Sequence, residues 1–331
     1  MEPPIVVTAA SAANDLPAVL RRSQEQFEAY VQASAEAFSA ATRRAIAGDT
    51  ALFTGFCADL GVSPMPALPA VIVAFIDRCV GRGHKPATIA RRISSVSHWH
   101  RAHGHRGEHD PTKAETVRLR LRGVRRQLGT RQRQAQGLTE IDVARIFGAV
   151  GGQPSLRDLR DVGLLLLCRD ALLRRSEAAA LDVADLETTG DGSGTVLIQR
   201  SKVDQEAQGA VLYVSPATLA WLNRWLAKAP ITSGALFRAF GKGGRLRGRL
   251  RAADIPAIFK GLAARAGIDP ALISGHSVRV GMAQDLVAGG YDLGGIMQAG
   301  RWKSAGMVAR YSERLMPDRG VLAQYDSRRG S

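Results

Sequence analysis

The amino-acid sequence predicts a mainly α-helical fold of two domains, with a small antiparallel sheet in the second. Three observations support this prediction. The chain has 331 residues, 45% of them hydrophobic, which is enough for two domains with separate cores. Apolar residues recur at spacings of three and four along most of the chain, as on one face of a helix. A polar stretch at 129–138 without this periodicity separates the two patterns.

The first domain is predicted to be small and entirely helical. Residues 1–35 begin with small and proline-rich sequence, and we expect a flexible tail there. From 36 to 128 the pattern is helical, and Pro86 and Thr88 suit the start of one of the helices. The apolar positions that carry the pattern are Phe53, Phe56, Leu60, Ile89, Ile93, Val96 and Trp99.

The second domain is predicted to span 139–331, after a linker at 129–138. Thr139 suits the start of a helix with Asp142 near its first turn. The four leucines at 164–167 indicate a buried helix. Two short apolar segments then flank a polar loop at 202–209 and predict a β-hairpin. Their apolar residues are Val196 and Ile198 before the loop, and Val211 and Tyr213 after it.

The basic composition predicts a polyanionic partner. The net charge is +15 and the pI is near 10.6, which suits nucleic acid or an anionic membrane surface. Most of the excess lies in residues 82–133, where 14 basic residues stand against three acidic ones. No run of 18 apolar residues is present, and the N-terminus lacks the blocks of a signal peptide. We therefore expect no membrane partner.

Two groups that can grip a phosphate lie three residues apart in the last third of the chain. His276 and Arg279 occur in Ser-Gly-His-Ser-Val-Arg-Val-Gly (274–281), and they share one face if this segment is helical. An arginine can bind two phosphate oxygens at once and stays protonated. An arginine of Leu-Leu-Arg-Arg-Ser-Glu (172–177) could converge with Arg279 on one phosphate.

The order Arg, Lys, His-x-x-Arg, Trp, Tyr resembles the tyrosine recombinases, the phage-integrase family. The likeness covers roughly residues 36–325 and is strongest in the last third. It implies a tyrosine recombinase fold, in which a helical core-binding domain and an α-rich catalytic domain close around DNA. The residues that carry it are Arg174, Lys202, His276, Arg279, Trp302 and Tyr311.

The resemblance implies a role for each of these residues. The family has its arginine three residues before an acidic one, which selects Arg174 over Arg175 and leaves Glu177 to orient the site. Tyr311 is the implied nucleophile, because only this tyrosine of the five has the family's spacing from the tryptophan. The other implied roles are general acid for Lys202, base or phosphate donor for His276, and donor and packing residue for Trp302, where many relatives carry His.

Two positions depart from the family's pattern. Arg175 stands where the family usually has an aliphatic residue, so the sequence alone leaves some choice between it and Arg174. Arg301, directly before Trp302, stands where the family usually has glycine.

The implied activity is site-specific recombination of double-stranded DNA. A phosphodiester is an anion that resists attack, so an enzyme without a metal needs fixed cations and its own nucleophile. Tyrosine attack would leave a 3′-phosphotyrosine link and a free 5′-hydroxyl, without ATP, metal or other cofactor. The resemblance also implies a tetramer on two duplexes, a Holliday junction, an inverted-repeat target and a docking helix after Tyr311.

Further positive residues are candidates for contacts with DNA phosphates. They come from the basic stretch of the first domain and from two places in the second, including the short basic piece at 244–251. These candidates are Arg44, Arg91, Arg92, Arg125, Arg126, Arg160, Lys242 and Arg245.

Six of the seven histidines lie within residues 84–109. A metal site there would lack cysteine partners, and we expect instead a solvated, basic helix end near DNA. The cysteines Cys57, Cys79 and Cys168 are scattered and predict reduced, mostly buried thiols in a cytoplasmic protein. The family resemblance further implies a protein encoded by a bacterium or phage and associated with the nucleoid.

Two other functions remain open at this stage. A type IB topoisomerase uses related tyrosine chemistry, but it relaxes DNA as a monomer and without a sequence requirement. A non-catalytic DNA-binding protein would account for the charge of +15, but not for the ordered series of site residues.

Overall fold

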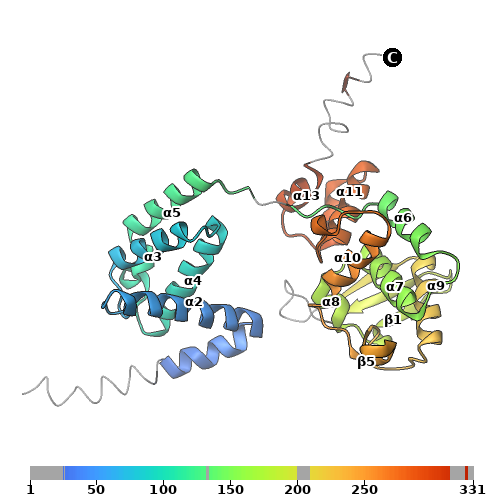
Figure 1. The fold of residues 1–331 in the computed structure, drawn as a ribbon, viewed down its shortest axis with the longest axis horizontal. Helices are drawn as coiled ribbons and strands as arrows, with labels where there is room; N and C mark the ends of the chain where they lie inside the picture. Colours follow the sequence, from blue (N-terminus) through green and yellow to red (C-terminus); the bar gives the residue numbers. More distant parts are fainter. Residues whose placement is uncertain (1–24, 26, 132–133, 200–208, 314–324, 327–331) are drawn as a thin grey trace, which may run out of the picture. The chain divides into compact units, whose positions relative to one another are not determined.

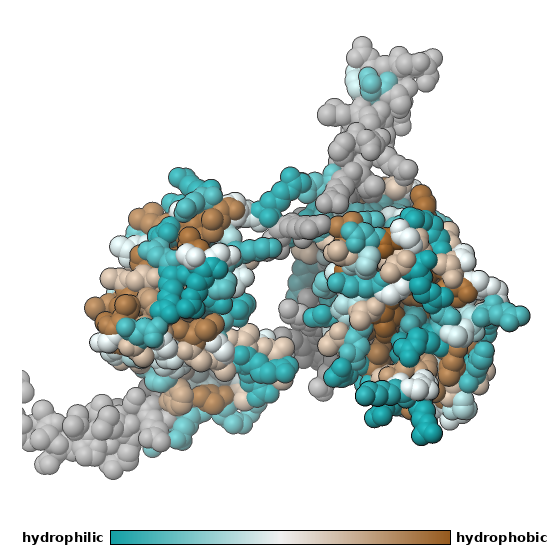
Figure 2. Space-filling model, viewed as in Figure 1, coloured by the Kyte–Doolittle hydropathy of each residue, from teal (hydrophilic) through white to brown (hydrophobic). Residues whose placement is uncertain are grey.

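The computed structural model describes residues 25, 27–131, 134–199, 209–313 and 325–326 (Figure 1). It divides into two compact units, Met1–Gln132 and Arg133–Ser331, each with its own hydrophobic core. Hydrophilic and apolar residues are interspersed on the visible faces of both units (Figure 2). Among the residues described, none of the helices combines the length and apolar character needed to cross a membrane.

Unit 1 is helical throughout the part that the structure describes. Phe53, Ile72 and Ile89 are fully buried where three of its helices meet, at the helical spacing predicted. Leu60 is 52% exposed instead, because the helix that carries Phe53 ends one residue earlier. The helices are α2 (Ala40–Asp59), α3 (Pro69–Gly81), α4 (Pro86–Ala102) and α5 (Glu115–Leu128), with 3-10 turns η1 (Gly107–His109) and η2 (Pro111–Lys113).

Residues 27–37 are helical, which differs from the flexible tail predicted for residues 1–35. Their side chains pack against α4: the Tyr30 hydroxyl lies 2.9 Å from Nδ1 of His98. The Phe27 ring also lies 4.6 Å from the His103 ring, centroid to centroid. Two histidines of the basic stretch therefore hold a neighbouring helix.

His100 is a core residue, so the prediction of a solvated helix end is wrong at this position. Its ring is fully buried, its Nε2 accepts a hydrogen bond from the Ala67 N–H at 3.1 Å, and its Nδ1 lies 2.9 Å from the Val96 carbonyl. Burial is the largest cause that lowers the pKa of His100. Within the described residues, no group of three or more His, Cys, Asp or Glu side chains could hold a metal ion.

Unit 2 contains eight described helices and two small antiparallel sheets, and this confirms the predicted fold class. Its central helix is α7 (Leu156–Asp170), whose residues 158–169 are all buried. The other helices are α6 (Glu140–Val150), α8 (Arg175–Ala180), α9 (Pro216–Lys228), α10 (Ile255–Arg265), α11 (Ser277–Ala288), α12 (Leu293–Gly300) and α13 (Ala305–Ser312), with 3-10 turns η3 (Val183–Asp185), η4 (Lys242–Gly244) and η5 (Pro270–Leu272).

The predicted hairpin is present in a three-stranded sheet of order β1-β2-β3. Val196 and Ile198 are buried, whereas Val211 and Tyr213 are exposed. The register explains the difference: Val196 pairs with Leu212, so the even-numbered residues of β3 face the core. The strands are β1 (Leu186–Thr188), β2 (Gly194–Ile198) and β3 (Ala210–Val214), and the second sheet pairs β4 (Arg238–Phe240) with β5 (Leu246–Arg249).

The end of the predicted linker lies on unit 2. The Leu138 N–H donates to the Ser277 carbonyl at 2.9 Å, and the Leu138 side chain is fully buried. A Cβ at Gly281 of α11 would lie only 1.9 Å from the Leu138 carbonyl oxygen. This close approach requires glycine at position 281. The segment from 134 to 138 thus braces the helix that carries Arg279.

All three cysteines are buried and free, as predicted. Cys168 lies in α7, and its burial, followed by the nearby charge of Glu177, raises the pKa of its thiol.

Candidate active site

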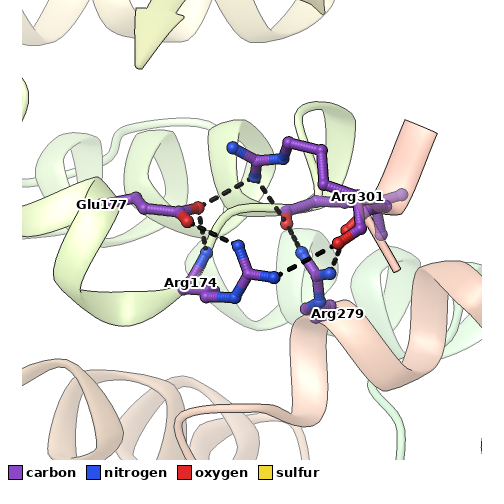
Figure 3. Close-up of polar contacts among 6 residues, drawn as sticks. Arg174, Glu177, Arg279 and Arg301 are labelled. Carbon is purple, nitrogen blue, oxygen red and sulfur yellow. Dashed lines mark hydrogen bonds and ion pairs between the residues drawn. The ribbon is translucent and has the colours of Figure 1, made fainter. Parts of the chain in front are cut away.

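Four segments of unit 2 bring their polar residues together at one place (Figure 3). The turn after α7 supplies Arg174, and the start of α8 supplies Glu177. Arg279 lies in the first turn of α11. Arg301 caps the C-terminal end of α12. Residues 127 positions apart are in contact here, because an Arg174 nitrogen lies 3.4 Å from the Arg301 carbonyl oxygen.

Arg279 is held by carbonyl oxygens. Its side chain is buried, its two terminal nitrogens donate to the carbonyls of Leu172 and Gly300, and its guanidinium carbon lies 4.4 Å from the centre of the Trp302 ring. These partners fix the guanidinium plane without neutralising its charge. Burial, followed by the charges of two neighbouring arginines, lowers the pKa of Arg279 to about 10, so it stays protonated at neutral pH.

Arg174 and Glu177 form an ion pair across the start of α8. The Arg174 backbone N–H donates to one carboxylate oxygen of Glu177 at 2.9 Å, and a guanidinium nitrogen donates to the other at 2.7 Å. The Glu177 side chain is only 1% exposed. A carboxylate buried to this degree needs paired charges to offset its lost hydration. Arg175, the alternative from the sequence, is exposed and lies beside Gly275.

Two residues at this place have left-handed backbone conformations. Leu172 has φ 45° and Arg301 has φ 53°, which costs a residue with a Cβ about 1–2 kcal/mol. The Leu172 carbonyl accepts from Arg279 and also from Arg301, and the Arg301 carbonyl accepts from Arg174. The two strained turns therefore direct carbonyl oxygens at arginine side chains. Strained backbone conformations of this kind cluster at functional sites.

Trp302 and Tyr311 form the apolar side of the site. The Trp302 ring is 8% exposed and its centre lies 5.7 Å from that of Tyr311. Tyr311 is half-buried in the short helix α13, and its carbonyl accepts a hydrogen bond from Gln284 at 3.0 Å. A Cβ at Gly300 would lie 2.0 Å from the Trp302 ring, so only glycine lets the indole pack here.

His276 lies at the N-terminal end of α11 and is exposed. Its backbone N–H donates to the Ser274 hydroxyl at 3.1 Å. Desolvation by neighbouring atoms, followed by the positive charges of Arg175, Arg279 and Arg174, lowers the pKa of His276. The imidazole is therefore neutral at neutral pH and has one nitrogen able to accept a proton.

Lys202 lies outside the described residues, in the 200–208 part of the hairpin loop. The strands on either side are in place, because Ile198 of β2 pairs with Ala210 of β3.

The candidate DNA contacts differ in their surroundings. Arg160 is 3% exposed, donates to Asp161 at 2.7 Å and lies over the Phe240 ring at 4.7 Å, so it belongs to an internal ion pair and is withdrawn as a candidate. Arg91 and Arg92 both pair with the buried Asp49. The remaining candidates, Arg44, Arg125, Arg126, Lys242 and Arg245, are exposed.

Known proteins share this fold. A Tn1549 transposon integrase in complex with transposon right end DNA has a TM-score of 0.61 at 14% identity, covering 89% of this chain and 98% of that one. A lambda integrase dimer bound to a core site has a TM-score of 0.56 at 14% identity, covering 93% and 86%. These two solved structures therefore share the fold of this chain.

Sequence comparison identifies the family. The profile described as "Phage integrase family" matches residues 136–316. An integrase/recombinase XerD homolog of Selenomonas ruminantium is 32% identical over 82% of this chain and 81% of its own length. The chain belongs to the phage integrase family, and it is a site-specific tyrosine recombinase.

The recombinase Cre of Escherichia phage P1 is 24% identical over 78% of this chain and 80% of its own length. From residues 274–302 we expect a likeness to Cre in particular, but over the whole alignment the identity to Cre is lower than the identity to the XerD homolog.

Proposed function

We propose that Tyr311 is the nucleophile and that Arg174 and Arg279 hold the phosphate it attacks. One observation carries this proposal: the buried Arg279 and Tyr311 both contact the Trp302 ring. Arg174 reaches the same place, because it contacts the carbonyl of the residue before Trp302. Buried guanidinium groups exert a stronger field on a phosphate than solvated ones, because little water screens them.

The reaction is an in-line displacement at phosphorus. The Tyr311 oxygen forms a bond to phosphorus, and the bond from phosphorus to the 5′-oxygen breaks with its electron pair on that oxygen. His276, kept neutral by its surroundings, accepts the phenol proton. Lys202 gives a proton to the departing 5′-oxygen. The product is a 3′-phosphotyrosine and a free 5′-hydroxyl, and a 5′-hydroxyl from the partner duplex reverses the step.

Strand exchange between two duplexes requires four such sites, so we propose a tetramer that passes through a Holliday junction on an inverted-repeat target. Among the similar structures, one is of XerH bound to a palindromic difH substrate after cleavage, with a TM-score of 0.57 at 17% identity. The proposed docking helix after Tyr311 falls mostly within residues 314–324, outside those described. We further propose that the site is of the Cre kind, with Trp302 beside Arg279.

Recovery of covalent adducts from cells tests this function. DNA that stays bound to the protein after denaturation is sequenced, and we expect one short site with inverted repeats. Adducts spread over all sequences, together with relaxation of supercoiled DNA by the monomer, would favour a topoisomerase. Absence of any adduct would leave only DNA binding.

A further inference from the structure

Arg301 is the least expected residue of the site. It occupies a left-handed backbone position at the end of α12, where glycine is the usual residue. Its side chain is 14% exposed. Among the described residues, its Nε and one terminal nitrogen are buried without a hydrogen-bond partner. A strained and incompletely bonded arginine lowers stability, so its presence calls for a functional reason.

The other terminal nitrogen of Arg301 reaches Glu177. It donates to a carboxylate oxygen at 2.8 Å, and that same oxygen accepts the Arg174 backbone N–H at 2.9 Å. The second carboxylate oxygen binds the Arg174 guanidinium. Glu177 is thus shared between two arginines (Figure 3). Without Arg301, the carboxylate would face Arg174 alone and would cancel its charge.

Arg301 changes the net charge that the site offers to a phosphate. Arg174, Arg279 and Arg301 together with Glu177 carry a net charge of +2, whereas the set without Arg301 carries +1. A phosphodiester has one negative charge. When phenolate oxygen adds to phosphorus, a second negative charge develops on the non-bridging oxygens. The additional cation therefore acts on the transition state more than on the bound substrate.

We propose that Arg301 is a positioning residue of this active site, which takes up the charge of Glu177 so that the charge of Arg174 remains available to the scissile phosphate. This inference rests on the proposed function, because it needs a phosphate bound by Arg174 and Arg279. It concerns a position where the family usually has glycine. It also gives a functional reason for an arginine at a position with a left-handed backbone.

The first test compares two substrates in single-turnover cleavage. Both carry the site recovered from cellular adducts, one with an ordinary scissile phosphate and one with a methylphosphonate. The methylphosphonate is uncharged before attack, so its transition state carries one negative charge in place of two and needs one cation less. Arg301→Gly removes the cation and suits the left-handed backbone. We expect it to be slower by about 10-fold or more on phosphate, by analogy with lost charge-stabilising contacts, and nearly unchanged on methylphosphonate. Arg224→Gln, which removes an exposed arginine stacked on Trp221, serves as the control and should affect neither rate.

The second test uses Glu177→Gln in combination with Arg301→Gly. The double variant restores a net charge of +2, so it should cleave phosphate faster than Arg301→Gly alone. Arg301→Lys keeps the charge and should retain most of the wild-type rate. An equal loss on both substrates, or a double variant slower than both single ones, would mean that Arg301 acts only through structure.

The two hypotheses fail differently. If the wild-type protein forms no covalent adduct, the proposed function falls, and this inference falls with it. If the wild type forms the adduct and Arg301→Gly matches it on phosphate, only the role of Arg301 is refuted.

Discussion

Helix α5 of unit 1 and the candidate active site of unit 2 use arginine in opposite ways. The last turn of α5 presents Arg125 and Arg126 to solvent, on a helix whose buried residues are Val117 and Val124. In unit 2, Arg279 is 4% exposed and is held by two carbonyl oxygens and a tryptophan ring. The same side chain is solvated in one place and almost dehydrated in the other.

This difference in exposure indicates that the arginines of α5 contribute to DNA affinity, whereas Arg279 contributes to the cleavage reaction. Exposed charges attract DNA over roughly the Debye length of about 10 Å, and salt screens them. A buried guanidinium acts at short range, and the lowering of the pKa of Arg279 to about 10 reflects the free energy lost in its dehydration. Variants of α5 should therefore change binding and its salt dependence, whereas variants of the site should change the cleavage rate.

The largest effect is expected for Tyr311→Phe. It removes the nucleophilic oxygen and keeps the ring beside Trp302, so DNA binding should be normal and the covalent adduct absent. Tyr213→Phe and Tyr291→Phe change exposed tyrosines of unit 2 and should leave the adduct measurable. A denaturing gel shows the result, and an adduct that survives Tyr311→Phe would assign the nucleophile elsewhere.

Lys202→Ala should slow cleavage by about 10² to 10⁴-fold, the usual contribution of a positioned general acid. Replacing the bridging 5′-oxygen with sulfur should restore nearly the wild-type rate, because a thiolate leaves without being protonated. Arg174→Ala should gain no such rescue, since its proposed task is to bind the non-bridging oxygens. Single-turnover rates on both substrates measure this, and failure of sulfur to rescue Lys202→Ala would make Lys242 or His276 the next candidate acid.

A smaller, purely electrostatic effect is expected in unit 1. Each phosphate contact adds about −0.9 to the slope of log K against log salt concentration. Changing Arg125 and Arg126 to glutamine should weaken binding to every sequence and reduce the slope by up to about 2. Arg78→Gln is the matched control, because Arg78 is already paired with Asp59 at 2.8 Å. A salt slope that does not change would place the DNA surface elsewhere.

The helices and the core of each unit could be predicted from the sequence, because apolar periodicity reports local packing directly. The helix start at Thr139, whose backbone N–H and hydroxyl both donate to the Asp142 carboxylate at 3.0 Å, could likewise be predicted. What the sequence could not show was which charged residues are internal. From the sequence, Arg160 is a basic residue that could contact DNA. In the fold it pairs with Asp161 and lies over the ring of Phe240, and it is buried.

The site residues followed from motif order, but the role of Arg301 did not. The sequence showed that position 301 carries arginine where the family usually has glycine. An arginine at a position whose backbone is left-handed can indicate a functional residue. Its partner Glu177 lies 124 residues away, however, and no spacing rule connects them. The prediction that His100 is solvated was wrong for a similar reason, because its hydrogen-bond partner Ala67 is 33 residues away in the sequence.

The smallest expected effect concerns Arg175, an exposed arginine within unit 2 that nonetheless influences the site. After desolvation, its charge is the largest cause that keeps the pKa of His276 below the ordinary value. If neutral His276 accepts the phenol proton, cleavage at subsaturating DNA should decline only at pH values below that ordinary pKa. Arg175→Ala removes a repelling charge, raises the pKa of His276 and should move this acid limb to higher pH, whereas Arg175→Lys should leave it in place. The second-order rate constant measured across pH reports the free enzyme, and an acid limb that stays put in Arg175→Ala would remove His276 as the base.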